Sequence, residues 1–144
     1  MEPVEINAGE YYLRQLRVDD RIDDRHTLAE RFGSLDRAGE HVALRANEWE
    51  TDAGCSWAVC EQLSNTAVGE VAVKSTGELF CWISPHHRGK GIATAAVAAV
   101  AGFAFGFLDL ETLSCTPCDK AAERVAQKCG FTAGSSHGVW TRLR

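Results

Sequence analysis

Apolar and polar residues follow each other along the first part of the chain in a pattern that predicts one strand and then two helices. Residues 11–17 alternate well enough to form a half-buried strand. An Asp-Asp pair then offers an N-cap for a helix over residues 19–32, and Gly33 ends that helix. Residues 34–47 carry apolar side chains at irregular helical spacing, which predicts a second helix.

Short β-prone runs dominate the rest of the chain. Three runs separated by turn residues predict an antiparallel meander, which Pro85 ends. An Ala-rich segment follows, and its larger apolar residues recur every three or four positions, which predicts a buried helix. The predicted elements are strands at 56–62, 67–74 and 78–84, a helix at 94–108, a strand at 111–115, a helix at 119–128, and a hairpin of 131–133 with 139–143.

The order of these elements indicates one α+β domain over residues 1–144, which is an ordinary length for a single domain. The meander and the closing hairpin predict a mostly antiparallel sheet. The strand, helix and strand between residues 78 and 115 imply one locally parallel crossover. We therefore expect a mixed sheet of about six to seven strands flanked by about four helices.

Composition is typical of a soluble globular protein, with 45% apolar and 24% charged residues. No stretch is long and apolar enough to span a bilayer, so we expect no membrane association. The first five residues are acidic, where a signal peptide would be basic and then apolar. These features predict a cytoplasmic protein.

The six cysteines are expected to be reduced and to pack as small hydrophobic residues, because a chain of this size does not need a disulfide framework. Cys115-Thr116-Pro117-Cys118 offers an alternative, since it lies between a predicted strand and a predicted helix, as a thioredoxin-like redox pair does. Only 26 residues follow Cys118, which is too few for the remainder of that fold.

The formal net charge of −5 argues against general binding to nucleic acid. Residues 1–84 carry 8 Lys and Arg against 16 Asp and Glu, a net charge of −8, and residues 85–144 carry 7 against 4, a net charge of +3. The basic part suits an anionic cofactor, and the acidic part suits an amine-bearing substrate. A chance distribution of surface charge explains the asymmetry equally well.

A loop rich in glycine and basic residues lies between the third strand of the meander and the Ala-rich helix. Gly89 and Gly91 let backbone amides approach an anion, and the free N–H groups at the start of the helix point toward it. Arg88 and Lys90 supply positive charge. The loop therefore predicts a phosphate site, with a purely structural turn as the alternative.

Two motifs resemble the GNAT superfamily of acyltransferases. The family signature is Gln or Arg, two residues, Gly, one residue, then Gly or Ala, and the chain reads Arg88-Gly89-Lys90-Gly91-Ile92-Ala93. The ribosomal-protein N-acetyltransferase branch carries Asn, two residues, Ala or Ser, Arg-Val-Ala, and then Lys-x-Gly-Phe. Here the chain reads Asp119-Lys120-Ala121-Ala122-Glu123-Arg124-Val125-Ala126-Gln127-Lys128-Cys129-Gly130-Phe131. The resemblance is strong from about residue 69 to 131 and loose before that.

The resemblance implies a GNAT fold and an acetyl-CoA or other acyl-CoA co-substrate, with no metal. In this family the thioester lies in a split between two strands, here those at 78–84 and 111–115. The pantetheine arm then pairs with the backbone near Cys81, and an N–H there polarises the thioester carbonyl. The expected cofactor-binding residues are Trp82, Ile83, Ser84, Arg88, Gly89, Lys90, Gly91, Ile92, Ala93, Thr94 and Asp119.

A base must deprotonate the acceptor amine, because an ammonium has no lone pair. Glu70 is the first candidate and Glu78 the second, since both lie on strands near the expected split. His86 and His87 follow just past the split. For each glutamate the alternative is a solvated residue on a strand face, and for each histidine it is an exposed loop.

The chain departs from the family pattern around the leaving group. Asp119 stands where relatives often have Asn, and a carboxylate cannot donate an amide N–H. Ala122 and Ala126 occupy positions that usually supply the general acid. The thiolate therefore leaves unassisted or takes its proton from water, or Cys118 substitutes as the acid.

The implied function is transfer of an acyl group, most simply acetyl, from a thioester to an amine by direct attack. An acyltransferase that uses an acyl-carrier protein as donor to a small metabolite is one alternative, and a non-catalytic acyl-CoA-binding protein is another. The acceptor, a small-molecule or peptide amine, is expected between residues 21–47 and the loop 134–138, where no motif identifies it. The sequence leaves the oligomeric state open, with a homodimer as one option because dimers are the commonest arrangement among soluble proteins of this kind.

Overall fold

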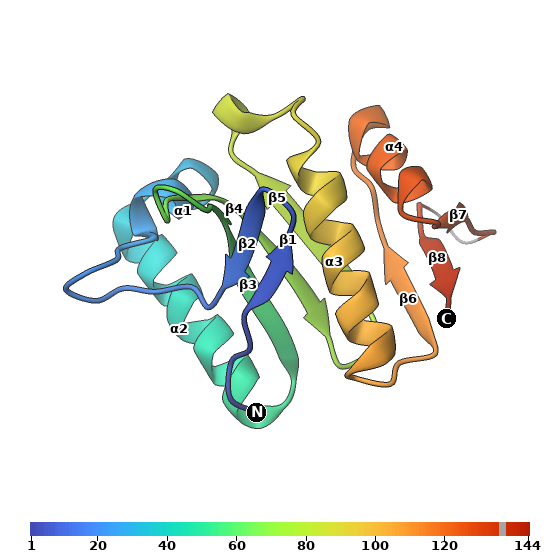
Figure 1. The fold of residues 1–144 in the computed structure, drawn as a ribbon, viewed down its shortest axis with the longest axis horizontal. Coiled ribbons are helices and arrows are strands. Elements are labelled where there is room, and N and C mark those ends of the chain that lie inside the picture. The colour runs from blue at the N-terminus through green and yellow to red at the C-terminus, as the bar shows by residue number, and fades with distance from the viewer. Residues whose placement is uncertain (136–137) are drawn as a thin grey trace.

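Two antiparallel sheets joined at one end form the frame of the protein (Figure 1). The computed structural model describes residues 1–135 and 138–144. The strands are β1 (Ile6–Ala8), β2 (Tyr11–Arg14), β3 (Gly54–Glu61), β4 (Ala67–Lys74), β5 (Leu79–Ile83), β6 (Thr112–Cys115), β7 (Thr132–Ala133) and β8 (Trp140–Leu143). The helices are α1 (Arg25–Phe32), α2 (Leu35–Thr51), α3 (Ile92–Gly106) and α4 (Lys120–Lys128), with a 3₁₀ turn η1 (Pro85–His87).

The larger sheet has the strand order β1-β2-β3-β4-β5, and the smaller sheet has the order β6-β8-β7. One parallel bridge between Glu78 and Ser114 joins the two sheets, where the Ser114 N–H donates to the Gly77 carbonyl at 2.9 Å. The α+β class is confirmed. The expected single sheet is divided in two, because the strands on either side of α3 meet at this bridge only in the part of the chain that the structure describes.

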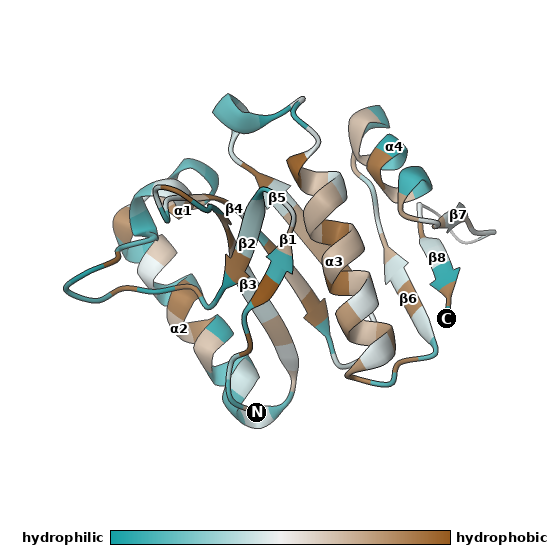
Figure 2. Cartoon of the chain, viewed as in Figure 1, coloured by the Kyte–Doolittle hydropathy of each residue, from teal (hydrophilic) through white to brown (hydrophobic). Residues whose placement is uncertain are grey.

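Each face of the larger sheet packs against different helices. On one face Val97 and Val100 of α3 pack with Trp57 and Val71 in the main core, and Figure 2 shows that α3 is apolar over most of its length. On the other face α1 and α2 cover a smaller apolar cluster, whose buried members are Leu16, Leu28, Ala38, Ala58, Cys60 and Ala67. The two faces therefore differ in the size of their apolar clusters.

The N-terminal part departs most from the predicted elements. Strand β1 (Ile6–Ala8) was not predicted, and α1 begins at Arg25 rather than at residue 19. The side chain of Asp19 accepts hydrogen bonds from the Arg21 and Ile22 N–H groups, both at 2.9 Å, and so forms a turn where a helix was expected. Aspartate competes with the helix for backbone donors in this way. The predicted closing hairpin is present as β7 and β8.

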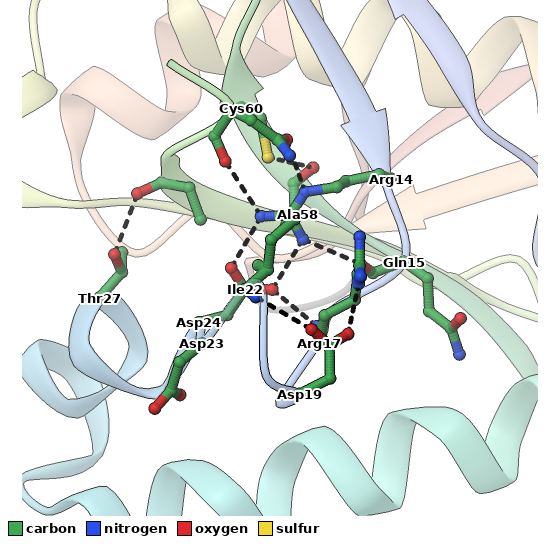
Figure 3. Close-up of polar contacts among 12 residues, drawn as sticks. Arg14, Gln15, Arg17, Asp19, Ile22, Asp23, Asp24, Thr27, Ala58 and Cys60 are labelled. Atoms are coloured by element: carbon green, nitrogen blue, oxygen red, sulfur yellow. Dashed lines mark hydrogen bonds and ion pairs between the residues drawn. The ribbon is translucent and has the colours of Figure 1, made fainter.

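A buried ion pair connects this N-terminal part to the sheet (Figure 3). Arg14 donates to both carboxylate oxygens of Asp24 at 2.8 Å, and the two side chains are 4% and 3% exposed. Asp24 also accepts from the Arg17 N–H at 2.7 Å, and the Arg14 Nε donates to the Asn65 side chain at 2.9 Å. Burial alone would lower the pKa of Arg14, but the hydrogen bond and charge of Asp24 raise it above its ordinary value. The pair therefore ties β2 to the start of α1 and to the β3–β4 turn.

We expect Asp24→Ala to lower the free energy of unfolding by about 3–5 kcal/mol, because the variant leaves the Arg14 charge buried without a partner. Urea denaturation measures the loss. Asp23→Ala is the matched control, since it removes an acid whose pair with Arg25 is partly exposed and should cost much less. Similar losses in the two variants would contradict the structural role of the buried pair.

Candidate active site

The predicted phosphate loop lies between the end of β5 and the start of α3. Gly89 and Gly91 both have φ of +78°, a left-handed conformation that side chains disfavour, and both face open space. Gly91 is the N-cap of α3, and the first intrahelical bond runs from the Ala95 N–H to the Gly91 carbonyl at 3.1 Å. The N–H groups of the first turn, including those of Ile92, Ala93 and Thr94, precede that bond and have no acceptor within the helix.

Two basic residues complete the loop. The Arg88 Nε donates to the Ile83 carbonyl at 2.9 Å, so the loop is fixed to the last residue of β5. Arg88 and Lys90 are both exposed. The loop thus combines free helix-terminal amides with positive charge, and this combination fits a diphosphate group.

The residues next to the loop point in other directions. Ser84 is buried, and its hydroxyl contacts the Glu30 carboxylate of α1 at 2.5 Å. His86 is exposed, whereas the Nδ1 atom of His87 is buried with no hydrogen-bond partner among the described residues. Of the predicted cofactor-binding set, Ser84 therefore faces α1, while the segment from Arg88 to Thr94 forms the loop and the first turn.

The two sheets separate beyond the bridge at Glu78. Strand β5 pairs with β4, with Trp82 opposite Glu70 and Ile83 opposite Gly69. Within the described residues, no pairing occupies the other edge of β5 beyond this bridge. A strand edge of this kind can bind an extended ligand through main-chain hydrogen bonds. The backbone of Trp82 and Ile83 lies on this open edge, and its pairing with a pantetheine arm stays a prediction.

Asp119 lies on the smaller-sheet side of this separation, at the start of α4. It is the N-cap of α4, and its side chain accepts from the Ala122 N–H at 2.8 Å. Figure 1 shows the loop before α3 and the first turn of α4 at the same end of the protein. The carboxylate therefore has a capping role that accounts for Asp at this position.

Glu70 lies in the middle of β4 and is fully buried against α2. Its two oxygens contact the His41 Nε2 atom at 2.8 and 2.9 Å, and one of them accepts from the Arg45 Nε at 2.9 Å. The Arg31 guanidinium lies 3.6 Å from the other oxygen. An ionised carboxylate only accepts hydrogen bonds, so the Nε2 atom carries the proton and Nδ1 is the acceptor of the neutral ring.

The charges around Glu70 explain its ionisation. Burial alone would raise the pKa of Glu70, but the hydrogen bond from His41 and the charge of Arg45 outweigh it and lower the pKa below its ordinary value. Glu48 also accepts from Arg45 at 2.8 Å. The carboxylate is therefore charged and fixed in position. Because it is fully buried, it can influence a bound molecule only through the residues that contact it.

Glu78 lies apart from this group. It precedes β5 at the bridge to Ser114, at the closed end of the separation, whereas the glycine loop follows the other end of β5. The structure therefore places Glu70 opposite Trp82, near the end of β5 that leads into the glycine loop, and leaves Glu78 at the other end of the strand. The role of either glutamate as base stays a prediction.

The sequence reasoning missed the three basic residues around Glu70, which are Arg31, His41 and Arg45. They lie 25 to 39 residues from Glu70 along the chain, so no local spacing connects them to it. One signal was available: His41 and Arg45 lie on the same side of α2 as the buried Ala38 and Trp49. Polar residues at helical spacing on an apolar face usually have a buried partner.

The six cysteines are all free. Burial raises the pKa of Cys115 to about 11, which is the opposite of what a redox pair with Cys118 requires. Among residues 1–135 and 138–144, no cluster of His, Cys, Asp and Glu could hold a metal ion. No helix in the same described residues combines the length and apolarity needed to cross a bilayer.

Comparisons with known proteins agree with the fold. A family model described as an acetyltransferase (GNAT) domain matches residues 10–132. A search of curated proteins by sequence found no match. Two solved structures are similar throughout: the ribosomal-protein-S5-alanine acetyltransferase of Vibrio fischeri (12% identity, TM-score 0.79, covering 97% of this chain and 96% of that one) and RimJ of Mycobacterium smegmatis in complex with CoA-disulfide (16%, 0.78, 99% and 86%).

A third similar structure is the microcin C7 self-immunity acetyltransferase MccE in complex with acetyl-CoA and AMP. It is 12% identical, with a TM-score of 0.73, over 94% of this chain and 93% of that one. At these identities the likeness shows a shared fold, and the family model carries the family assignment.

We expect the contribution of Glu70 to stability to disappear in acid. A carboxylate whose folded-state pKa is depressed stabilises the fold above its unfolded pKa of about 4.3, and this stabilisation is lost as the pH falls through the folded value. Glu70→Gln should therefore be less stable than the parent above about pH 5, and the difference should narrow below about pH 4. Urea denaturation across this range measures it, and a gap that does not change with pH would contradict the ion-paired state.

Proposed function

The chain belongs to the GNAT acetyltransferase family and is an N-acetyltransferase, and we propose that it moves the acetyl group directly from acetyl-CoA to an amine. The observation that carries this proposal is the loop at the N-terminus of α3, where two left-handed glycines leave free amides beside Arg88 and Lys90. The open edge of β5 ends at the same loop. One extended ligand with a diphosphate would contact both features.

The donor side of this proposal uses mainly the backbone. The amides of the α3 first turn would bind the diphosphate, and Arg88, whose Nε is committed to Ile83, would offer its Nη groups. The backbone of Trp82 and Ile83 would hold the pantetheine arm and donate to the thioester oxygen. Coenzyme A, when bound, supplies the acetyl thioester and the leaving thiolate.

The acceptor side needs a group that removes a proton from the attacking amine. We propose that His41 is this group and that Glu70, the first sequence candidate, is a positioning residue. Glu70 is fully buried, and both of its oxygens are occupied, whereas the imidazole keeps one nitrogen as an acceptor. Glu70 lies directly opposite Trp82, so the pair is adjacent to the expected thioester.

In the proposed transfer one bond forms, one bond breaks and one proton leaves the amine. The amine nitrogen forms a C–N bond with the acetyl carbon, the C–S bond breaks, and the amine proton moves to His41. The thiolate then takes a proton from water, since Ala122 and Ala126 provide no acid. The buried charge of Glu70 stabilises the imidazolium formed in this step.

We expect the double variant Arg88→Ala, Gly91→Glu to bind acetyl-CoA about 100-fold more weakly or worse, because it removes a cation, strains the loop and adds a negative charge at the anion site. Isothermal titration measures the affinity, and circular dichroism verifies folding. Lys74→Ala, which removes an exposed cation at the end of β4, is the control. Unchanged affinity in the folded double variant would refute the proposed donor site.

Release of free thiol from acetyl-CoA in the presence of an amine panel tests the activity itself. Acetyl-pantetheine, which lacks the diphosphate, should react equally well with the parent and with the loop variant. Acetylated acyl-carrier protein is the comparison donor, and we expect it to be the poorer one. Absence of amine-dependent thiol release with every donor would refute the proposed function.

We expect His41→Ala to lower kcat by about 10²- to 10⁴-fold, the usual contribution of a general base, with partial recovery when imidazole is added. Glu70→Gln should lower kcat less and should shift the acidic limb of the pH–rate profile, because that limb reports protonation of the base. His26→Ala removes an exposed histidine of α1 and should leave kcat unchanged. A folded His41→Ala variant with parental kcat would exclude His41 as the base.

A further inference from the structure

Among the charged residues around Glu70, Arg31 has the weakest pairing with an acidic side chain. It lies in the last turn of α1, and its guanidinium is 4.3 Å from the centre of the Phe80 ring of β5 and 4.7 Å from the centre of the Phe32 ring. Its closest acidic atom is Glu70 Oε1, at 3.6 Å, which is too long for a hydrogen bond. No hydrogen bond from the Arg31 side chain to any described residue is present.

The other charges of this region are already paired. Arg45 donates one hydrogen bond to Glu70 and another to Glu48. The Ser84 hydroxyl donates to the Glu30 carboxylate. Burial lowers the pKa of Arg31, Glu70 only partly offsets this, and the neighbouring charge of Arg45 lowers it further. The guanidinium of Arg31 thus packs against two aromatic rings, and its N–H groups donate to no described residue. The carboxylate nearest to it, Glu70, is also paired with Arg45.

The position of Arg31 relates it to the acceptor. Its side chain is 31% exposed, in contrast to the fully buried Glu70 next to it. Phe80 and Trp82 are partly exposed, and their cross-strand partners Ala72 and Glu70 place them on the face of the sheet that α1 and α2 cover. A molecule that reaches the thioester from this face would pass Arg31.

We infer that Arg31 binds a carboxylate of the acceptor, so that the substrate is an amine with a carboxylate a few bonds from its amino group. This inference rests on the proposed function, and it specifies the substrate class. A guanidinium with free donors matches a carboxylate with two parallel hydrogen bonds. Since Arg31 lies 3.6 Å from Glu70, a carboxylate on Arg31 would place an α-amino group beside His41 and Glu70.

Two sources can supply this chemistry, a free α-amino acid or a peptide whose first residue is Asp or Glu. The test compares kcat/KM for matched pairs of acceptors, with acetyl-CoA as donor and thiol release as readout. Alanine is paired with ethylamine, ornithine with putrescine, and Asp-Ala amide with Asn-Ala amide. The first two pairs report on free amino acids, and the third reports on peptides.

We expect at least one carboxylate-bearing acceptor to exceed its matched partner by roughly 10- to 100-fold in kcat/KM, the range for hydrogen bonds to a charged group. In Arg31→Met the kcat/KM values within a pair should become about equal, and in Arg31→Lys part of the preference for the carboxylate should remain. The ratio within each variant is the readout, so a general effect of Arg31 on Glu70 or on stability cancels. Arg37→Met, which removes an exposed arginine of α2, should leave the ratio unchanged.

Three results would overturn the inference. Equal kcat/KM within every pair would leave the proposed transferase activity intact but would show that the carboxylate is not recognised. An unchanged kcat/KM ratio in Arg31→Met would show that another residue recognises the carboxylate. Arg31 would then have only a structural role between α1 and β5. Absence of acetyl transfer to every amine would refute the proposed function and, with it, this inference.

Discussion

The contact of Gly77 with the strand β6 is the constraint on which the functional architecture depends. Gly77 has φ of +94°, and a Cβ there would lie 2.5 Å from the Thr112 carbonyl oxygen, so only glycine allows β5 and β6 to meet this closely. Within residues 1–135 and 138–144 the two strands meet only at that end, so they separate toward the other end. The separation leaves the edge of β5 unpaired at the point where the glycine loop turns into α3.

The face of the sheet under α1 and α2 contains buried charged groups as well as an apolar cluster. Arg14 with Asp24 fixes the start of α1, and Glu70 with His41 and Arg45 fixes α2 over β4. Buried ion pairs contribute less to stability than apolar residues of the same size would, because both charges lose their hydration. Placing such charges in the interior favours one arrangement of the two helices, and it leaves ionisable groups next to Trp82.

The two sides of the site differ in what kind of group they use. The proposed donor side would consist of main-chain amides and a strand edge, which depend on backbone conformation and tolerate many side chains. The proposed acceptor side would consist of side chains on α1, α2 and β4, namely Arg31, His41 and Glu70. Variation among proteins of one fold can therefore change the acceptor while the donor stays the same.

The sequence by itself determined the class of fold, the order of most elements and the position of the glycine-rich loop before α3, because periodicity, glycine and helix-start signals are local. It did not determine that residues 19–24 form a turn, or that Glu70 is enclosed, since both depend on partners distant in the chain, such as Arg14 and His41. Only the tertiary structure placed Glu78 at the closed end and Arg31 beside Glu70. Each of these contacts joins residues far apart in the sequence, and several chemically similar residues could have formed it. The local sequence pattern does not indicate which of them does.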